Sequence, residues 1–281
     1  MSYDRINSYA KINLALNVIG KRSKLHIIET LVAFLDLFDE ILIKKIVSKK
    51  NDISFSGKFS KNINRNNTVS KLFHFLEKRK ILRNQKFQIK IKKLIPTKSG
   101  LGGGSMNAAS ILGYLIKKKV IKPKKNEITK LCNLVGSDVI LGLDPRFTIL
   151  YSKKKIKRFS SRKKIYVMIA KPNFGCSTKI IYSKVKNFNR PKLSNPSKKM
   201  FELNSLIKMN NSLEQIALKK YPKLKKLKSS IEKLTKPRFV RMTGSGSALV
   251  AYFSSKKQCE NAKKKISKEY KNYWCMASKT I

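Results

Sequence analysis

Alternating apolar and polar positions predict several β-strands in this chain. Between residues 8 and 20, the apolar side chains Ile12, Leu14, Leu16 and Val18 recur at every second position. The other segments with a strand-like pattern are 41–47, 87–91, 165–170 and 248–253. Residues 27–38 are apolar without a clear period, so the pattern there allows either a strand or a buried helix.

Other segments show the apolar spacing of amphipathic helices. In residues 68–79, one helical face would carry Val69, Leu72, Phe73 and Leu76. Further helices are expected over 106–119, on both sides of Tyr221-Pro222 between 200 and 233, and over 258–270. Strands and helices are mixed along the chain and no internal repeat is visible, which predicts the α+β class.

The length of 281 residues suggests one or two domains. A charged stretch at 153–164, interpreted as a linker or a hairpin, separates two halves that each contain strands and helices. We therefore expect an N-terminal domain over residues 1–158 and a C-terminal domain over residues 159–281.

Composition adds a strong positive charge, with 65 Lys and Arg against 15 Asp and Glu for a formal net charge of +50. Only 11 of these cations are Arg, the residue that bidentate recognition of phosphates and base edges favours. Lys, Ile and Asn are abundant from end to end, and AT-rich codons encode all three. A compositional drift of the genome would therefore produce this charge without any anionic partner.

The remaining composition excludes several classes of protein. A hydrophobic content of 41% can build a core, which argues against global disorder. Charged and polar residues interrupt every apolar run in the first 30 residues, and the uncharged stretch 99–116 is too rich in Gly, Ser and Asn to span a membrane. The four cysteines form no C-x-x-C pair and are expected to be reduced, mostly buried thiols of a cytoplasmic protein.

The segment with the most chemical information is the Gly-rich stretch 96–110, between a predicted strand and a predicted helix. Gly100, Gly102, Gly103 and Gly104 allow positive φ angles, so their N–H groups can turn toward one point. The N-terminus of the following helix would aim its dipole at the same point. This arrangement suits a di- or triphosphate, although the segment is neither a Walker A nor a dinucleotide-binding sequence.

Two charged residues and a second Gly-rich turn are weaker candidates. Lys11 follows Ala10 in the first predicted strand, where a solvated lysine is the simpler interpretation. Asp138 lies in an apolar stretch, where a carboxylate is costly unless it is paired, but it could equally cap a helix or form a turn beside Gly136. The turn 242–248 could contact a phosphate or simply lead into the next strand.

Taken together, these segments resemble the GHMP small-molecule kinases along nearly the whole chain. The matching segments, in order, are Ala10-Lys-Ile-Asn-Leu14, His26-Ile-Ile-Glu-Thr-Leu31, Phe34-Leu-Asp36 with Asp39, 100–109, Gly136-Ser-Asp-Val139, Asn211-Ser-Leu-Glu214 and Thr243-Gly-Ser-Gly246. The first segment, the early His26 and the Ser-Asp-Val segment are similar to the branch that phosphorylates the 2-hydroxyl of 4-diphosphocytidyl-2-C-methyl-D-erythritol. That reaction belongs to the non-mevalonate (methylerythritol phosphate) pathway of isoprenoid precursor biosynthesis.

The resemblance implies a fold and a set of functional residues. The fold would combine an N-terminal domain like domain 2 of ribosomal protein S5 with a ferredoxin-like C-terminal domain. ATP and Mg²⁺ would be the cofactors, with Asp138 as general base and Lys11 as charge stabiliser. The remaining implied contacts are, for ATP, Pro96, Thr97, Lys98, Ser99, Gly100, Leu101, Gly102, Gly103, Gly104, Ser105, Met106 and Asn67, and, for the cytidine substrate, Asn13, His26 and Tyr182. Ser105 is also a candidate hydroxyl ligand for Mg²⁺.

Four positions depart from the family pattern. Leu25 precedes His26 where an aromatic residue is usual, so one wall around the base would be aliphatic. Met106 stands in place of a second Ser, Ser212 in place of an acidic residue, and Ile140 in place of a Pro. None of the four alters the Lys11 and Asp138 pair, so the departures bear on substrate affinity more than on reaction type.

Two other functions remain open. A nucleic-acid-binding protein would fit the charge, but the sequence has no zinc finger, no paired RNA-binding aromatics and no Arg-rich stripe. A homoserine or mevalonate kinase relative would share the Gly-rich loop, but the His26 region argues against it. We expect a small-molecule substrate, no specific nucleic acid, no membrane, and a monomer or weak homodimer.

Overall fold

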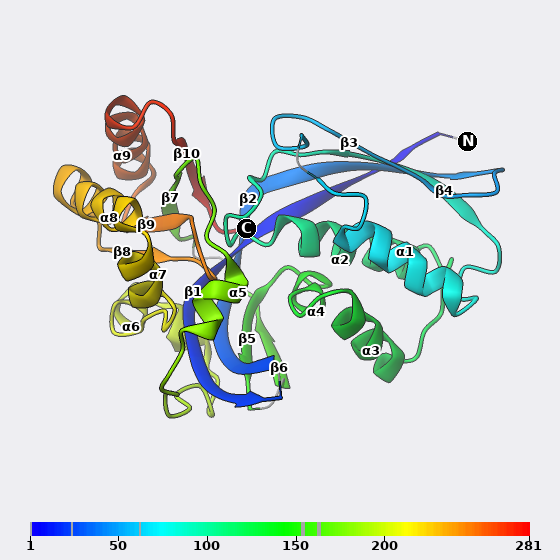
Figure 1. Cartoon of the computed structure of the whole chain (residues 1–281), viewed down its shortest axis with the longest axis horizontal. Coiled ribbons are helices and arrows are strands. Elements are labelled where there is room, and N and C mark those ends of the chain that lie inside the picture. The colour runs from blue at the N-terminus through cyan, green and yellow to red at the C-terminus, as the bar shows by residue number, and fades with distance from the viewer. Residues whose placement is uncertain (1, 24, 62, 153–154, 162–163) are drawn as a thin grey trace. The chain divides into compact units, whose positions relative to one another are not determined.

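The computed structural model describes residues 2–23, 25–61, 63–152, 155–161 and 164–281. These residues form two compact units (Figure 1). Unit 1 comprises Met1–Lys11, Leu37–Thr97 and Gly102–Pro145, and unit 2 comprises Ile12–Asp36, Lys98–Leu101 and Arg146–Ile281. Two long strands, β1 (Asp4–Arg22) and β2 (Leu25–Ile46), contribute to both units.

Unit 1 combines a sheet with four helices. The second half of β2 pairs antiparallel with β4 (Lys86–Lys92), which pairs parallel with β3 (Asp52–Ser56). The helices are α1 (Thr68–Lys78), α2 (Gly103–Lys117), α3 (Lys125–Val135) and the short α4 (Val139–Gly142).

The helices of unit 1 lie on one side of its strands (Figure 1). The core between them takes Ile43 and Ile89 from the strands, and Leu72 from α1 and Leu112 from α2. The predicted alternation thus gives each strand one buried face.

Unit 2 contains a four-stranded antiparallel sheet in the order β10-β7-β9-β8. Its strands are β7 (Tyr166–Lys171), β8 (Phe239–Met242), β9 (Leu249–Phe253) and β10 (Trp274–Lys279). The first half of β2 pairs separately with β5 (Phe147–Tyr151), which forms a hairpin with β6 (Lys155–Phe159).

The helices of unit 2 are α5 (Thr178–Ser183), α6 (Leu203–Ile207), α7 (Glu214–Lys220), α8 (Pro222–Thr235) and α9 (Lys256–Glu269), with a 3₁₀ turn at Lys198–Phe201. Leu227 and Ile231 of α8 and Ile266 of α9 are fully buried in the core that includes the sheet. The lysines of both helices lie mainly on their outer faces.

The observed elements confirm the α+β prediction and settle one open point. Residues 27–38 are strand and not helix, because they form the first part of β2. The helix predicted over 106–119 begins earlier, at Gly103, inside the Gly-rich stretch. Sequence reasoning missed α3, α4, α5, β3, β5, β8 and β10. Most of these are short, but α3 carries its buried Leu131, Cys132 and Val135 at helical spacing.

The expected division into domains 1–158 and 159–281 stays a prediction, because the two compact units exchange segments several times along the chain. The charged stretch expected at this boundary, 153–164, is partly described, and its residues 155–159 form β6. Positions 153–154 and 162–163 of that stretch lie outside the described residues.

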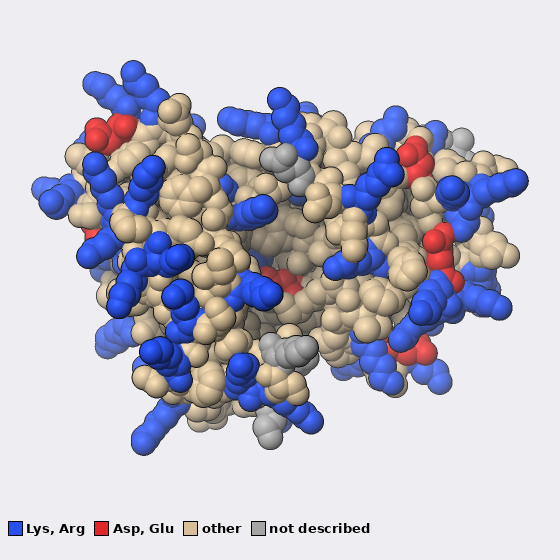
Figure 2. All heavy atoms as spheres, viewed as in Figure 1, with Lys and Arg blue, Asp and Glu red and all other residues tan. Residues whose placement is uncertain are grey.

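The surface and the cysteines agree with the composition. Figure 2 shows Lys and Arg spread over the whole visible face and not gathered into one stripe. The four cysteines are free thiols, and burial raises the pKa of Cys132, Cys176 and Cys259 to about 11. Within the described ranges, no helix has both the length and the apolar character that crossing a membrane requires.

Candidate active site

Lys11 and Asp138 form an ion pair inside unit 1. The Nζ atom of Lys11 on β1 lies 3.2 Å from Oδ2 of Asp138. The Lys11 side chain is 4% exposed and that of Asp138 is 31% exposed, so the carboxylate can still meet solvent or a ligand. Lys11 is therefore not a solvated strand lysine, although it is one of many lysines in the chain.

Asp138 occupies the N-cap position of α4 without serving as its cap. Its side chain makes no capping hydrogen bond to the backbone of that helix within the described part of the chain. The carboxylate reaches Lys11 instead, which supports a paired charge over the capping interpretation.

Gly102 brings the Gly-rich turn against Lys11. It adopts φ +73° and ψ 6° at the N-cap of α2, a conformation that favours glycine. A Cβ atom at this position would lie 2.8 Å from Cγ and 3.0 Å from Cε of Lys11. The absence of a side chain at Gly102 therefore lets the lysine stem pass directly beside the turn.

The N-terminus of α2 offers a cradle for an anion. The N-cap residue Gly102 has no side chain to cap this helix, and the N–H groups of the first turn of an α-helix have no partner within the helix. Ser105 belongs to this turn, and its Oγ would lie 3.7 Å from a Cβ built at Gly136, two residues before Asp138. Phosphate groups bind at helix N-termini of this kind.

The start of α1 lies beside the same turn. Thr68 Oγ1 donates a 2.7 Å hydrogen bond to the carbonyl of Gly104. The preceding residue, Asn67, caps α1, because its Oδ1 accepts from the N–H groups of Val69 and Ser70. Asn67, expected on the adenine side of the ATP site, thus has a structural role next to the Gly-rich turn.

A buried polar cluster that the sequence did not reveal lies under this turn. Lys93 Nζ donates to a carboxylate oxygen of Asp39 and, at 2.8 Å, to Oδ1 of Asn107 on α2. Asn107 Nδ2 in turn donates to Asp39 at 3.0 Å. Lys93 Nζ would lie 3.3 Å from a Cβ at Gly103, so the cluster supports the first turn of α2 from below.

The electrostatics of this cluster are those of a buried ion pair. Burial lowers the pKa of Lys93, and the charge of Asp39 opposes that shift. Asp39 was noted in the sequence only as part of a motif, and Lys93 was hidden within a Lys-Lys pair. Because the chain has only six Asp, the presence of a carboxylate at position 39 was the sequence feature that could have indicated this cluster.

The middle of the Gly-rich stretch, residues 98–101, belongs to unit 2, where it meets the second Gly-rich turn. The carbonyl of Ser99 accepts from Ala248 N at 3.0 Å, and that of Gly100 accepts from Thr243 Oγ1 at 3.3 Å. A Cβ at Gly100, where φ is +81°, would lie 2.1 Å from the carbonyl oxygen of Thr243. Only glycine allows these two segments to approach so closely.

Polar side chains hold the second turn in place. Asn211 Nδ2 donates to the carbonyls of Met242 and Gly244, both at 2.8 Å. The N–H of Asn13 donates to Thr243 Oγ1 at 2.9 Å, and Asn13 Nδ2 donates to Thr30 Oγ1 at the same distance. Asn13 is therefore buried and its side chain is oriented by the protein itself.

His26 and Tyr182, both expected to contact the cytidine substrate, lie close together in unit 2. The ring of His26, at the start of β2, lies 5.0 Å from that of Tyr182 on α5, at an angle of 42°. A third ring, Phe188, lies 6.4 Å from His26 and was not predicted. Burial, assisted by the positive charge of Lys21, lowers the pKa of His26, so its imidazole is neutral at neutral pH.

The other predicted ATP-loop residues divide by burial. Thr97 and Lys98 are exposed, whereas Pro96, Leu101 and Met106 are buried. Met106 packs against α4, because its Sδ would lie 2.7 Å from a Cβ at Gly142. The methionine that replaces the family's usual serine thus contributes to the core beneath the turn.

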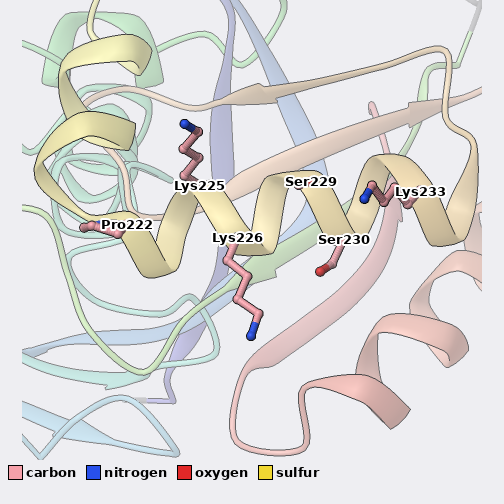
Figure 3. A pocket seen from close by; sticks show the side chains of 6 residues that line it. All are labelled: Pro222, Lys225, Lys226, Ser229, Ser230 and Lys233. Atoms are coloured by element: carbon pink, nitrogen blue, oxygen red, sulfur yellow. The ribbon is translucent and has the colours of Figure 1, made fainter.

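A pocket of about 440 Å³ on unit 2 contains none of these residues (Figure 3). It is lined from α8 alone, by Pro222, Lys225, Lys226, Ser229, Ser230 and Lys233. The described residues contain no group of three or more His, Cys, Asp or Glu side chains that could hold a metal ion.

Comparisons with known proteins agree with this geometry. Residues 67–150 match the GHMP kinases N terminal domain, and residues 185–272 match the GHMP kinases C terminal domain. The chain is 53% identical over 281 residues, the full length of both chains, to 4-diphosphocytidyl-2-C-methyl-D-erythritol kinase of Pelagibacter ubique. It is 32% identical to the enzyme of that name from Petrotoga mobilis, over 87% of this chain and 96% of the relative.

A solved structure is also similar in fold. The crystal structure of a 4-(cytidine 5'-diphospho)-2C-methyl-D-erythritol kinase superposes with a TM-score of 0.78 at 23% identity. The match covers 99% of this chain and all of that chain. Sequence identity and fold similarity therefore indicate the same family.

Proposed function

Because the chain belongs to the GHMP kinases and, within them, to the 4-diphosphocytidyl-2-C-methyl-D-erythritol kinases, we propose that it phosphorylates the 2-hydroxyl of that compound with ATP. The chain is a small-molecule kinase with the two-domain α+β fold of its family. Beyond the family membership, the observation that carries the proposal is the Lys11–Asp138 ion pair beside the N-terminus of α2.

In the proposed reaction, Asp138 accepts the proton of the substrate hydroxyl as that oxygen becomes a nucleophile. Lys11 at 3.2 Å orients the carboxylate, and its partial exposure leaves it accessible to the hydroxyl. Lys11 also stabilises negative charge that spreads over the transferred phosphoryl group. Phosphoryl transfer depends chiefly on such positioning and charge neutralisation, so the pair supplies what this chemistry needs.

The Gly-rich stretch 96–106 would hold the phosphates of ATP. In unit 1, the uncapped N–H groups at the start of α2 and the hydroxyl of Ser105 would bind phosphate oxygens. Bound ATP supplies the phosphoryl group, and Mg²⁺ held on its phosphates neutralises their charge. We propose Ser105 as the hydroxyl that reaches the ion, and Lys98 as an added positive charge. Asn67, at the start of α1, would border the adenine side.

In unit 2, His26, Tyr182 and Asn13 would bind the cytidine substrate. A neutral imidazole has one donor and one acceptor nitrogen, so His26 can pair with the polar edge of cytosine. The ring of Tyr182 would cover a face of the base. A base lacking the matching groups would leave His26 unpaired, which gives selectivity.

The remaining expectations follow from the same proposal. The proposed phosphorylation is a step of the methylerythritol phosphate pathway to isoprenoid precursors. We place the enzyme in the cytoplasm. We expect a monomer or weak homodimer and no specific nucleic-acid partner. The positive charge would attract two polyanionic substrates through its field.

One assay tests the proposal. The purified protein is incubated with ATP, Mg²⁺ and 4-diphosphocytidyl-2-C-methyl-D-erythritol, and ADP release is measured beside Asp138→Asn and Asp138→Ala. Asp52→Asn is a matched control, because Asp52 is an exposed carboxylate of unit 1 that bonds Gln88. Homoserine and mevalonate serve as alternative acceptors. Wild-type activity no higher than that of Asp138→Ala, or a preference for another acceptor, would reject the proposed reaction.

A further inference from the structure

An exposed aromatic ring next to His26 has no role in the function proposed so far. Phe188 is 47% exposed and is the only aromatic among the exposed large hydrophobic side chains of the described residues. Its ring lies 6.4 Å from that of His26, at an angle of 59°. Exposing a Phe ring forgoes the stabilisation that its burial would give, which suggests a ligand that covers it.

Three of the seven exposed large apolar side chains of the described residues belong to the segments that carry these rings: Leu25, Ile180 and Phe188. Leu25, which precedes His26, is 72% exposed, and Ile180, on the same helix as Tyr182, is 40% exposed. Together with Phe188 they come from the three segments that carry or border the His26–Tyr182 contact. We call these five side chains, Leu25, His26, Ile180, Tyr182 and Phe188, the aromatic patch.

The segment that carries Phe188 lacks regular secondary structure but is fixed on both sides of the ring. On one side, the N–H of Val185 donates to the carbonyl of Tyr182 at 3.1 Å. On the other, the N–H of Asn189 donates to the carbonyl of Val18 at 2.9 Å, and Asn189 Nδ2 donates to Ser212 Oγ at 2.7 Å. The position of Phe188 is thus set by hydrogen bonds to its immediate neighbours.

Glu29 fixes the continuation of this segment. Its carboxylate is fully buried, with Oε1 accepting from the N–H of Lys192 at 2.6 Å and Oε2 from that of Leu193 at 3.1 Å. Asn17 Nδ2 donates a further 2.9 Å bond to Oε1. A buried carboxylate with three donors is a strong anchor, because removing it would leave those N–H groups unpaired. Glu29 follows His26 by three residues on β2, so the segment after Phe188 is hydrogen-bonded to the strand that carries His26.

We propose that Phe188 is a further substrate-recognition residue, whose ring packs against the pyrimidine base held at His26, and that Glu29 is the positioning residue that keeps Phe188 there. This inference rests on the proposed function, because it takes the cytidine moiety of that substrate as the ligand. The aliphatic Leu25 provides no ring on its side of His26, so Phe188 supplies the second aromatic surface of the patch.

Kinetics test the role of Phe188. Stacking of a base on an aromatic ring contributes about 1–3 kcal/mol, so Phe188→Ala should raise the KM for the cytidine substrate about tenfold. The kcat and the KM for ATP should stay within about twofold, and Phe188→Tyr should restore the wild-type KM. Leu234→Ala is the matched control, because Leu234 is 41% exposed and belongs to α8, outside the patch. An unchanged KM in Phe188→Ala would overturn the proposal.

A second measurement reads the patch directly. The chain has two histidines, so ¹H NMR shows two imidazole Cε1–H signals, which His74→Gln assigns. Cytidine diphosphate should shift the His26 signal and leave that of His74 in place, with affinity about tenfold lower in Phe188→Ala. Glu29→Gln keeps the shape of the side chain but turns one acceptor into a donor, so it should weaken cytidine diphosphate binding about threefold and alter the His26 signal of the free protein. Equal affinities in all variants would overturn the proposal, as would the absence of binding to the wild type at millimolar ligand.

The two readouts separate this proposal from the one on which it rests. A protein that binds cytidine diphosphate through Phe188 but phosphorylates no cytidine substrate would reject the kinase reaction and support the patch. A protein that phosphorylates the cytidine substrate, and whose Phe188→Ala variant has an unchanged KM, would support the kinase reaction and reject the role of Phe188. Thermal unfolding of each variant identifies any that fail to fold, and Phe188→Leu, which keeps apolar volume, then replaces Phe188→Ala with the same expected direction.

Discussion

The substitution Gly102→Ala tests whether the Gly-rich turn positions Lys11. Gly102 has φ +73°, and a methyl group there would lie 2.8 Å from Cγ of Lys11, where 3.4 Å is the lower end of ordinary contact. The stem of Lys11 must therefore move by about 0.6 Å, or the turn must open by that amount. Either movement disturbs the 3.2 Å contact between Lys11 and Asp138.

The expected effect is larger on catalysis than on stability. A misplacement of 1 Å at a reacting centre can cost about a hundredfold in rate, so about 0.6 Å corresponds to a loss of roughly tenfold in kcat. The left-handed backbone should cost Ala about 1–2 kcal/mol in free energy of unfolding. Both follow from one methyl group placed against the stem of Lys11.

The measurement pairs steady-state kinetics with urea unfolding, and the control is Gly113→Ala on the same helix. No described atom outside the α2 backbone and its chain neighbours lies within 4 Å of a Cβ at Gly113, in the interior of α2. In that variant, the free energy of unfolding should rise by about 1 kcal/mol through helix propensity, and the activity should stay at the wild-type level. A Gly102→Ala enzyme with wild-type kcat would refute the reasoning, because the turn would then not constrain Lys11.

Three further predictions concern charged groups. Lys11→Met should lower kcat at least a hundredfold with little change in fold, checked by ADP release and circular dichroism; a loss below threefold would contradict its role. Asp39→Ala should lower the free energy of unfolding by about 3–5 kcal/mol, because it leaves Lys93 buried without its counter-charge. Urea titration measures this free energy, and a decrease below about 1 kcal/mol would contradict the prediction. The pKa of His26 lies below its ordinary value of 6.5, so the imidazole becomes charged only as the pH falls below 6.5. Substrate affinity should therefore be constant above pH 7 and weaken in acid, and an NMR titration midpoint of 6.5 or higher would contradict this.

Local sequence patterns predicted much of the fold for a physical reason. The strand around Ile89 has one buried face, and the strand around Ile12 alternates apolar with polar side chains although both of its faces are buried. The period of two is therefore visible in both without any tertiary information. Strand β10 was missed, because its burial depends on neighbours distant in sequence and its own composition is mixed. Helix α3 was missed although its apolar residues Ile128, Leu131, Cys132 and Val135 recur at helical spacing. Residues 27–38 were ambiguous, since a strand buried on both faces has no period to read.

The candidate site also contains residues that the sequence predicts and residues that only the structure reveals. The glycines at 100 and 102–104 were recognisable in the sequence, because a strand, four glycines and a helix start are a local pattern. Resemblance to a family identified His26 and Asp138, but not the cluster of Asp39, Lys93 and Asn107, nor the ring of Phe188. The lysine in that cluster could not be distinguished from the many others, and Phe188 is in a segment without periodicity.

By itself, the sequence determined the α+β class, the Gly-rich turn and the kinds of residue available for phosphoryl transfer. Only the tertiary structure decided which of the many lysines is buried against Asp138, and that Gly102 leaves room for its stem. The physical reason is that a lysine acquires a special role through exclusion of water and proximity of a carboxylate, and both are properties of packing. Identical side chains in sequence thus become unequal when the fold places one of them beside a partner.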